Sequence, residues 1–285
     1  MQRGTEDDEY HIPVGRLPEG FRDTVGTPTG DPVRPRPAAT VILLREAASA
    51  PEILLLKRNR STGFVPGAYV FPGGRVDHAD GSEAASARWT ELSVEEAGRR
   101  LGIGPGGPVT ALAFYTAAVR EAFEETGLLL TRPFASVDSP ESPFSAGRDA
   151  LLEDRGSWPG FLENHELRMD GRRLEYVAHW VTPVVEPRRY DTRFFAAVVP
   201  KGSEARIDPR EMVDAVWLRA SDALDRHEAG DLPMIFPTIR TLEDLAHFTS
   251  TEALLAHYRE TSIPMVMPEI VQTETGVALR IPDRR

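Results

Sequence analysis

The densest group of residues that could perform chemistry is the run REAFEETG at positions 120–127. A helix over 110–126 places Glu121, Glu124 and Glu125 within about 100° of one another around its axis. Carboxylates three and four residues apart repel each other, and the C-terminal end of a helix is the negative end of its dipole, so this face needs a counter-charge. Hard divalent cations bind carboxylate oxygens together with substrate phosphates. The run is therefore either a solvated acidic face, which is the simpler interpretation of the helix alone, or a site for Mg²⁺ or Mn²⁺.

The composition of the chain excludes several other kinds of chemistry. Its 285 residues carry 33 Lys and Arg against 44 Asp and Glu, a net charge of −11, and no cysteine. The acidic balance argues against a nucleic-acid surface but leaves room for a small phosphorylated ligand, because a bound cation can invert the local charge. The lack of cysteine excludes disulfides, thiolate zinc sites and a thiol nucleophile. No apolar run approaches the ~20 residues that cross a bilayer, so we expect a cytoplasmic protein without a membrane partner.

The residues around the acidic run predict a mixed sheet between layers of helices, which is an α/β fold. Gly127 is expected to end the acidic helix, and Ser93 with Glu96 forms a capping box for a short helix that Gly102 closes. Ser221 and Thr249 are expected to cap later helices. Strands are predicted near 39–44, 53–56, 64–74, 173–182, 193–199 and 213–218, and further helices near 146–165, 240–248 and 252–259.

Two parts of the chain together resemble the Nudix box, whose pattern is G-x5-E-x7-R-E-U-x-E-E-x-G-U with U an aliphatic residue. The matching positions are Gly74, Arg120, Glu121, Glu124, Glu125, Gly127 and Leu128. Phe71-Pro72-Gly73-Gly74 is also similar to the usual entry from strand to loop. These fixed residues at fixed places make the resemblance fairly specific.

The sequence departs from the Nudix pattern at three points. Asp80 stands where the pattern has Glu, Ala122 occupies an aliphatic position, and residues 81–119 give 39 positions where the pattern has seven. One branch of the family, the peroxisomal acyl-coenzyme A diphosphatases, carries such an insertion, and residues 54–77 are similar to that branch in order and spacing. The resemblance implies an α/β/α sandwich with a mixed sheet.

The domain organisation follows from this resemblance and from the composition along the chain. We expect an extended or disordered arm over 1–37, where prolines recur and no periodicity shows. A Nudix hydrolase domain is expected over 38–232, with an insertion at 81–109 inside the box. A C-terminal helical extension over 233–285 is expected to pack on the same domain. The insertion and the extension form either a lid or the interface of a homodimer, and the sequence does not decide between them.

The resemblance also implies roles for the acidic helix. Glu121, Glu124 and Glu125 would hold Mg²⁺ or Mn²⁺, with the carbonyls of Gly73 and Gly74 nearby, and Glu125 is the first choice of direct ligand. Arg120 would pair with Asp80 and so fix the loop against the helix, with Asp77 as the alternative partner.

Further candidates lie outside the box. Family members often use an acid from a later loop as base or as an extra metal ligand. The loop before residue 213 offers Glu204, Asp208 and Glu211, of which Glu211 is best placed. A solvated loop acid is an equally good interpretation of Glu211. Lys57 and Arg58 would hold substrate phosphates, and their alternative interpretation is as surface cations.

The resemblance implies hydrolysis of the diphosphate in a nucleoside diphosphate linked to another moiety. The branch similarity favours coenzyme A or acyl-coenzyme A, cleaved to 3′,5′-ADP and (acyl-)4′-phosphopantetheine. ADP-ribose, a dinucleotide or a nucleotide sugar is the alternative substrate. A non-catalytic nucleotide sensor is the alternative from another class, and the retention of all three acids favours the enzyme.

Overall fold

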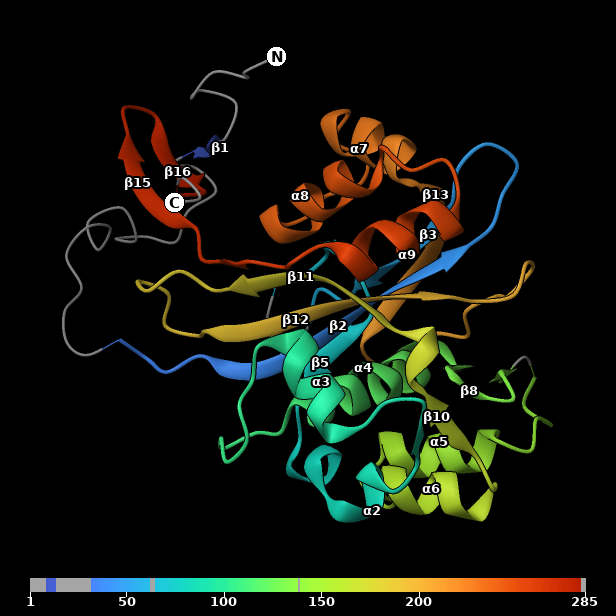
Figure 1. The fold of residues 1–285 in the computed structure, drawn as a ribbon. Coiled ribbons are helices and arrows are strands. Elements are labelled where there is room, and N and C mark those ends of the chain that lie inside the picture. The colour runs from blue at the N-terminus through green and yellow to red at the C-terminus, as the bar shows by residue number, and fades with distance from the viewer. Residues whose placement is uncertain (1–8, 14–31, 62–64, 138, 283–285) are drawn as a thin grey trace. The chain divides into compact units, whose positions relative to one another are not determined.

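The computed structural model describes residues 9–13, 32–61, 65–137 and 139–282 (Figure 1). The chain divides into two compact units. The larger unit comprises Ala38–Ala178 and Arg193–Ile263, and the smaller comprises Met1–Pro37, His179–Thr192 and Pro264–Arg285. All the site residues expected from the sequence belong to the larger unit.

The larger unit is built on a mostly antiparallel sheet with the strand order β13-β3-β2-β12-β11. Short strands β4 and β5 pair with β3 and β2. Residues 41–44 in β2 are fully buried, as expected of a strand that is covered on both faces. The strands are β2 (Arg36–Arg45), β3 (Glu52–Arg58), β4 (Tyr69–Val70), β5 (Gly73–Arg75), β11 (Glu175–Val181), β12 (Tyr190–Val198) and β13 (Met212–Arg219).

Helices cover both faces of this sheet, with α3 and α4 on one side and α7, α8 and α9 on the other (Figure 1). The expected α/β/α sandwich is therefore confirmed. The helices of the larger unit are α2 (Glu83–Ser86), α3 (Val94–Leu101), α4 (Ala111–Thr126), α5 (Ser145–Leu152), α6 (Trp158–Asn164), α7 (Ala220–Glu228), α8 (Phe236–Leu245) and α9 (Thr251–Glu260).

Helix α4 is the central helix of the unit, and 14 of its 16 residues are buried. Tyr115 packs against Phe195 of β12, with ring centroids 4.4 Å apart. On its other side, Phe123 stacks on Phe161 of α6 at 4.9 Å. The two residues that are not buried are Glu121 and Glu124. The helix is thus held rigidly by apolar contacts while part of its acidic face remains accessible.

The predicted insertion forms ordered structure that packs on α4. It contains part of the 3-10 helix η2 (His78–Gly81), followed by α2, β6 (Trp89–Thr90) and α3. As predicted, Ser93 accepts a hydrogen bond from the Glu96 amide and Gly102 ends α3 in the left-handed conformation. The Trp89 indole donates to the Thr116 hydroxyl at 3.0 Å, which joins the insertion to the middle of α4.

Short strands complete the large unit beyond α4. Strands β6, β10 (Arg168–Asp170) and β8 (Thr131–Arg132) form a three-stranded sheet, and η3 (Gly171–Arg173) follows β10. A separate pair consists of β7 (Leu128–Leu129) and β9 (Ala135–Ser136). Strand β7 directly follows Gly127, where α4 ends, and its pairing with β9 brings the chain back toward the end of α4.

Two predicted helix caps are wrong. Helix α7 begins directly where β13 ends, with Arg219 at the cap position, so Ser221 lies inside the first turn. Helix α9 is capped by Ser250, whose hydroxyl accepts from the Ala253 amide, and not by Thr249. The Glu46 carboxylate accepts from both the amide and the hydroxyl of Thr251, which fixes the first helical residue two positions after the predicted cap.

The smaller unit contains a three-stranded antiparallel sheet in the order β1-β16-β15. Its strands are β1 (Glu9–Pro13), β15 (Glu269–Thr273) and β16 (Gly276–Arg280). In addition, β14 (Met265–Val266) pairs in parallel with residues 179–180 of β11. Of the predicted arm over 1–37, residues 9–13 form a strand, and residues 1–8 and 14–31 lie outside the described residues. The last twenty residues, for which the sequence suggested one strand or an arm, hold β15 and β16.

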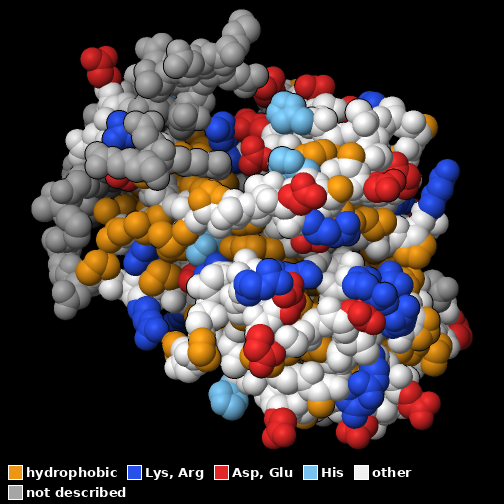
Figure 2. All heavy atoms as spheres, viewed as in Figure 1, with side chains coloured by type: hydrophobic (Ala, Val, Ile, Leu, Met, Phe, Trp, Pro, Cys, Tyr) orange, Lys and Arg blue, Asp and Glu red, His pale blue; other side chains and the backbone are white. Residues whose placement is uncertain are grey.

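The charges on the surface concern the expectation of no nucleic-acid partner, and the character of the helices concerns the expectation of no membrane partner. On the face shown in Figure 2, acidic and basic side chains of the described residues are interspersed rather than separated by sign. None of the helices in the described ranges combines the length and the apolar character that a membrane span requires.

Candidate active site

The acidic face ends at a sharp turn. Gly127 has φ 73° and its amide donates to the Phe123 carbonyl at 2.8 Å. Thr126 is therefore the last helical residue, and Gly127 caps the helix. A left-handed residue at this place is most readily a glycine. Glu121, Glu124 and Glu125 consequently occupy the last two turns of a buried helix, as the sequence predicts.

The two predicted glycines bring β5 into direct contact with this face. The Gly73 amide donates to Glu125 Oε2 at 3.0 Å. A Cβ atom on Gly74 would overlap the carboxylate of Glu121. A Cβ atom on Gly73 would lie 2.8 Å from the Cα atom of Thr40 on β2. The β2 backbone therefore excludes a side chain at Gly73, whereas a side chain at Gly74 would push aside the movable end of Glu121, so Gly74 is required to keep that carboxylate where Arg120 holds it.

Arg120 is the hub of the acid cluster. It is only 7% exposed, and its Nε and Nη2 atoms each donate at 2.9 Å to a different oxygen of Asp80. Its Nη1 donates to Glu121 at 2.9 Å and to Glu124 at 3.0 Å. The predicted pair with Asp80 is thus present, whereas Asp77 stands 3.6 Å away.

Asp80 is held in place for this pairing. It is 1% exposed, and its second role is to accept the Asp77 amide at 2.8 Å in the capping box of η2. The Arg75 carbonyl also accepts from Arg120 Nη2 at 2.9 Å. Arg120 therefore clamps the strand β5, the 3-10 helix and the acidic helix into one structure, and the shorter Asp side chain suffices at position 80.

The negative charge of the cluster exceeds what Arg120 compensates. Burial raises the pKa of Glu121 to about 7, against the opposing effect of Arg120. Burial and then the charge of Glu121 raise the pKa of Glu125 well above its ordinary value. Burial alone would lower the pKa of Arg120, but the bonds to Asp80 and the charge of Glu121 raise it above its usual range. An additional positive charge at this site would be favourable.

Of the two predicted phosphate-binding cations, only Arg58 faces the acids. Its charge acts on Glu125 and lowers the pKa of that carboxyl, and its Nε atom is buried without a hydrogen-bond partner. Lys57 is the neighbouring residue on β3 and so points to the other face of the sheet. Its Nζ lies 5.3 Å from the centre of the Tyr69 ring, and the Tyr69 hydroxyl donates to Asp214 at 2.7 Å.

Glu211 is exposed and directly precedes β13. Its charge makes a minor contribution to the raised pKa of Glu125. Its carbonyl accepts from the amide of Asn59, the residue after Arg58, at 2.7 Å. Glu204 bonds Arg45 at 3.0 Å, and Asp208 pairs with Arg210 at 2.9 Å, so these two loop acids are engaged elsewhere.

The donors of the cluster suit a hard divalent cation, since they are carboxylate oxygens on consecutive turns of a rigid helix. The described residues hold no group of three acidic or histidine side chains already arranged as metal ligands. The reason is that Arg120 holds Glu121 and Glu124, while the Gly73 amide holds Glu125. The excess negative charge is the observation that makes the site fit a cation.

Sequence reasoning missed the residue that closes the C-terminal end of α4. Arg148 of α5 donates to the Glu124 carbonyl through Nη2 at 2.7 Å and through Nε at 3.2 Å. A cation near the C-terminus of a helix was the expected counter-charge. Its position 24 residues farther along the chain and its backbone partners leave no pattern that identifies it in advance.

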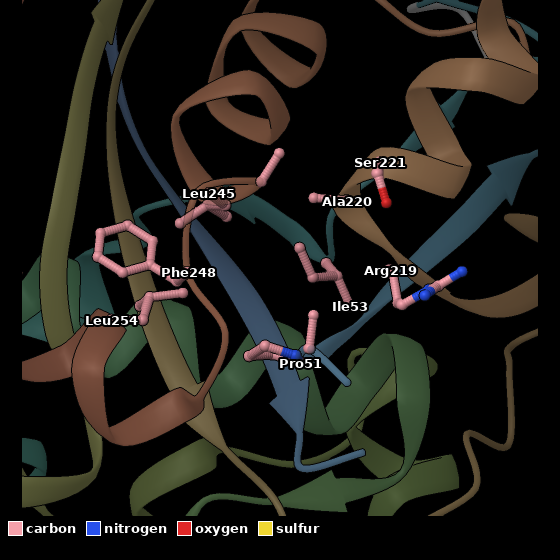
Figure 3. Close-up of a pocket in the computed structure, with 10 residues that line it drawn as sticks. Pro51, Ile53, Arg219, Ala220, Ser221, Leu245, Phe248 and Leu254 are labelled. Carbon is pink, nitrogen blue, oxygen red and sulfur yellow. The ribbon is translucent and has the colours of Figure 1, made fainter. Parts of the chain in front are cut away.

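Of two cavities among the described residues of the larger unit, neither is lined by the acids of α4, and only the second is lined by a candidate loop acid, Asp208. One of about 20 Å³ lies among Pro51, Ile53, Leu245 and Phe248, at the opposite end of β3 from Arg58 (Figure 3). That volume suits a single water molecule. The other, of about 290 Å³, lies between α5 and residues 206–210 and is lined by Arg148.

The chain is similar to known proteins over most of its length. The family model described as the NUDT19 Nudix domain matches residues 108–245. The chain is 29% identical to the human acyl-coenzyme A diphosphatase NUDT19 over 272 residues, which cover 78% of this chain and 72% of that protein. The Xenopus laevis protein of the same name is 26% identical, with 81% and 70% covered.

A solved structure agrees with this assignment. The crystal structure of a Nudix hydrolase from Alicyclobacillus acidocaldarius superposes with a TM-score of 0.64 and 29% identity, covering 79% of this chain and 96% of that one. The family model includes α4 with its acids, and the superposition covers most of the fold that holds them. The chain is therefore similar to Nudix hydrolases in both sequence and fold.

Proposed function

We propose that the protein is a divalent-metal-dependent diphosphatase that cleaves coenzyme A or acyl-coenzyme A into 3′,5′-ADP and (acyl-)4′-phosphopantetheine. The observation that carries the proposal is the intact acid cluster of α4, buried against Gly73 and Gly74 with more negative charge than Arg120 offsets. The substrate is supported by relatives named acyl-coenzyme A diphosphatase. This support for the substrate comes from sequence similarity, and one fold can serve many substrates.

In this proposal Glu121, Glu124 and Glu125 hold Mg²⁺ or Mn²⁺, together with the carbonyl of Gly73. The cation supplies neutralisation of phosphate oxygens and lowers the pKa of the attacking water. Glu125 is the principal ligand, because it is the most deeply buried of the three and Arg120 does not bind it. Gly74 leaves the space that the Glu121 carboxylate occupies.

Arg58 and Glu211 act from the two segments that flank the cluster. Arg58, whose charge acts on Glu125, donates hydrogen bonds from its guanidinium to the diphosphate oxygens. Glu211 accepts a proton from the attacking water at its carboxylate. A new bond forms between the water oxygen and one phosphorus, the bond from that phosphorus to the bridging oxygen breaks, and the bridging oxygen leaves with the second phosphate.

Arg120 and Asp80 act by positioning. Their paired contacts fix β5 and η2 against α4, so that the Gly73 backbone and the acids keep one geometry. Such preorganisation matters because the reaction depends on electrostatic stabilisation at defined places. Lys57, which faces Tyr69, has a structural role in this proposal.

The proposal extends to the organisation of the chain. The catalytic domain spans 38–232 with its insertion at 81–109. Residues 233–263 of the C-terminal extension, which hold α8 and α9, lie in the larger unit, whereas residues 264–285 lie in the smaller unit. A cytoplasmic location is supported by the absence of cysteine. We propose no nucleic-acid partner, in keeping with the net charge of −11.

Product analysis by mass spectrometry tests the proposed function. The protein is incubated with Mg²⁺, and separately with Mn²⁺, and with coenzyme A, acetyl-coenzyme A, ADP-ribose, NADH and a nucleotide sugar. Glu125→Gln is the inactive comparison. Glu163→Gln is its matched control, because Glu163 is an exposed acid on α6 that pairs with Arg88, away from the acid cluster.

The products separate the hypotheses. The proposal expects 3′,5′-ADP from the coenzyme A substrates with the wild type and Glu163→Gln, and none with Glu125→Gln. Formation of AMP from ADP-ribose or NADH, without 3′,5′-ADP from the coenzyme A substrates, would change the assigned substrate. The proposed metal-dependent hydrolysis would still hold. Tight binding of a nucleotide without turnover under either metal would overturn the enzyme in favour of a sensor.

A further inference from the structure

We infer that Arg148 is a positioning residue that fixes the loop carrying Glu211 to the C-terminal end of the acidic helix. It would thereby set where Glu211 stands relative to the acids of α4. The effect on turnover rests on the proposed function, whereas the fixing of the loop can be measured without it.

Arg148 joins two segments that are far apart in the sequence. Its guanidinium is buried, at 5% exposed, and it donates to the Glu124 carbonyl. The same Nη2 atom donates at 2.7 Å to the carbonyl of Arg206. Among the described contacts, its hydrogen bonds go only to backbone carbonyls. A planar guanidinium is suited to this bridging, because its donors point in fixed directions.

The Arg206 backbone itself meets the end of α4. Its amide donates to the Thr126 carbonyl at 2.8 Å. The carbonyls of Glu124 and Thr126 belong to the last helical turn, which has no later turn to bond. Arg148 and Arg206 therefore satisfy this end of the helix together, and the start of the loop is fixed there.

The other end of the same loop is fixed beside Arg58. The Glu211 carbonyl accepts from the Asn59 amide, and the amides of Glu211 and Met212 donate to the Asp208 carbonyl at 3.2 and 2.9 Å. Only four residues lie between Arg206 and Glu211, and they include this tight turn. A displacement at Arg206 is therefore transmitted to Glu211 rather than absorbed by slack chain.

Removal of Arg148 should leave the fold intact. The cavity of about 290 Å³ is lined by both Arg148 and Arg206, so water can enter the space that a shorter side chain would leave and reach the Arg206 carbonyl. The backbone bond from Arg206 to Thr126 also remains. Loss of Arg148 is thus expected to loosen one loop, not to unfold the domain.

Hydrogen exchange read by mass spectrometry tests the fixing of the loop in the full chain. Arg148→Met should speed exchange in peptides covering 204–212 about tenfold or more relative to peptides of α4 and β3. Arg148→Lys, which keeps donors and charge, should give an intermediate rate. Arg155→Met is the matched control, because Arg155 is an exposed arginine that bonds only Glu153 in the described contacts.

Unchanged exchange over 204–212 in Arg148→Met would overturn the inference. A uniform rise over the whole larger unit would also overturn it, because Arg148 would then stabilise the fold in general. These outcomes do not depend on turnover, so they stay distinct from failure of the proposed function.

A double-mutant cycle with Glu211→Gln tests the consequence for catalysis. Arg148→Met should lower kcat on acyl-coenzyme A by about 10- to 100-fold with KM within about threefold, as small misplacements of a reacting group do. In the Glu211→Gln background it should lower kcat by less than about threefold, because the group it positions is gone. Equal losses in both backgrounds, or a fully active Glu211→Gln, would overturn the positioning of Glu211. Absence of turnover by the wild type on every diphosphate would instead refute the proposed function.

Discussion

Arg120 and Arg148 are two buried arginines that contact the same half of α4, yet their surroundings differ in kind. Arg120 binds three carboxylates, and their contributions raise its pKa. Arg148 binds carbonyl groups, and burial lowers its pKa to about 10. The first environment is a charge cluster, in which the same contacts determine both the positions of the charged groups and their pKa values. The second is a structural contact in which the described hydrogen bonds of the guanidinium go to backbone carbonyls, while the charges of Asp208 and Asp149 act on it from nearby.

This difference indicates how the molecule separates two tasks. Around Arg120 the acids outweigh the single cation, so the cluster is costly in the metal-free protein and suited to a divalent cation. Around Arg148 the helix end and a loop are joined through backbone carbonyl groups, which every residue possesses. The carboxylates are therefore concentrated on one side of the helix end, while the other side holds the loop in place.

The largest expected effect comes from neutralising the deepest acid. Glu125→Gln should lower kcat about 10³-fold or more, because the loss of a metal ligand removes several kcal/mol of transition-state stabilisation. The same change should raise the Tm of the metal-free protein, because a buried carboxylate beside Glu121 is removed. Steady-state kinetics and a thermal melt in EDTA measure both, and Glu163→Gln should change neither. A lower metal-free Tm would contradict the charge-cluster description.

Breaking the Arg120 pair should be the largest change in stability. Arg120→Met leaves Asp80 buried without its cation, and loss of one partner of a buried pair costs about 3–5 kcal/mol. Urea unfolding monitored by circular dichroism gives the free energy of unfolding. A loss below about 1 kcal/mol would mean that solvent reaches Asp80 and that the cluster is looser than described.

Arg148→Met should destabilise the protein less than Arg120→Met does. Water from the cavity can enter the space that the guanidinium leaves, so we expect about 1.5–3 kcal/mol, the range for hydrogen bonds to charged groups. The comparison with Arg120→Met is made under the same urea conditions. If Arg148→Met proves the more destabilising of the two, the charge cluster around Arg120 and the backbone contacts of Arg148 do not differ in the way described.

The smallest effect is a dependence of stability on pH that a metal ion should suppress. The folded pKa of Glu121, about 7, lies above its value of 4.5 in an unfolded chain, so the folded state holds the extra proton between these pH values. Its contribution to stability therefore falls as pH rises from 4.5 to 7 and stays low above that. In EDTA the Tm should drop by a few degrees between pH 5.5 and 8.

Mg²⁺ should remove most of that drop, because it binds the ionised acids and stabilises the folded state more at pH 8 than at pH 5.5. Differential scanning fluorimetry at both pH values, with and without Mg²⁺, measures the four Tm values. The Glu121→Gln variant serves as control, since its drop in EDTA should be smaller. An equal effect of Mg²⁺ at the two pH values would argue that the ion binds elsewhere.

The sequence predicts the parts of the site that depend on local periodicity. The acidic helix, its stop at Gly127 and the shared face of Glu121, Glu124 and Glu125 follow from 3.6 residues per turn and from glycine chemistry. The contact between Arg120 and Asp80, 40 residues apart, was accessible only through the family resemblance. The close approach that requires Gly74 became evident only from the structure.

Other features depend on tertiary contacts that no local pattern records. Alternation along β3 separates Lys57 from Arg58, but which of them faces the acids depends on how the sheet packs on α4. The start of α9 is shifted because Glu46, more than 200 residues earlier, binds Thr251. Arg148 was missed for the same reason, since its partners are backbone carbonyls whose positions only the fold determines.

The central claim is that the acids of α4 form a divalent-metal site, and Mn²⁺ binding followed by electron paramagnetic resonance tests it most directly. Free Mn²⁺ is titrated into the metal-free wild type, Glu125→Gln and Glu163→Gln. The account predicts stoichiometric binding to the wild type and to Glu163→Gln, with affinity reduced at least tenfold in Glu125→Gln. Equal Mn²⁺ affinity in Glu125→Gln and the wild type, or no binding by any of the three, would contradict it.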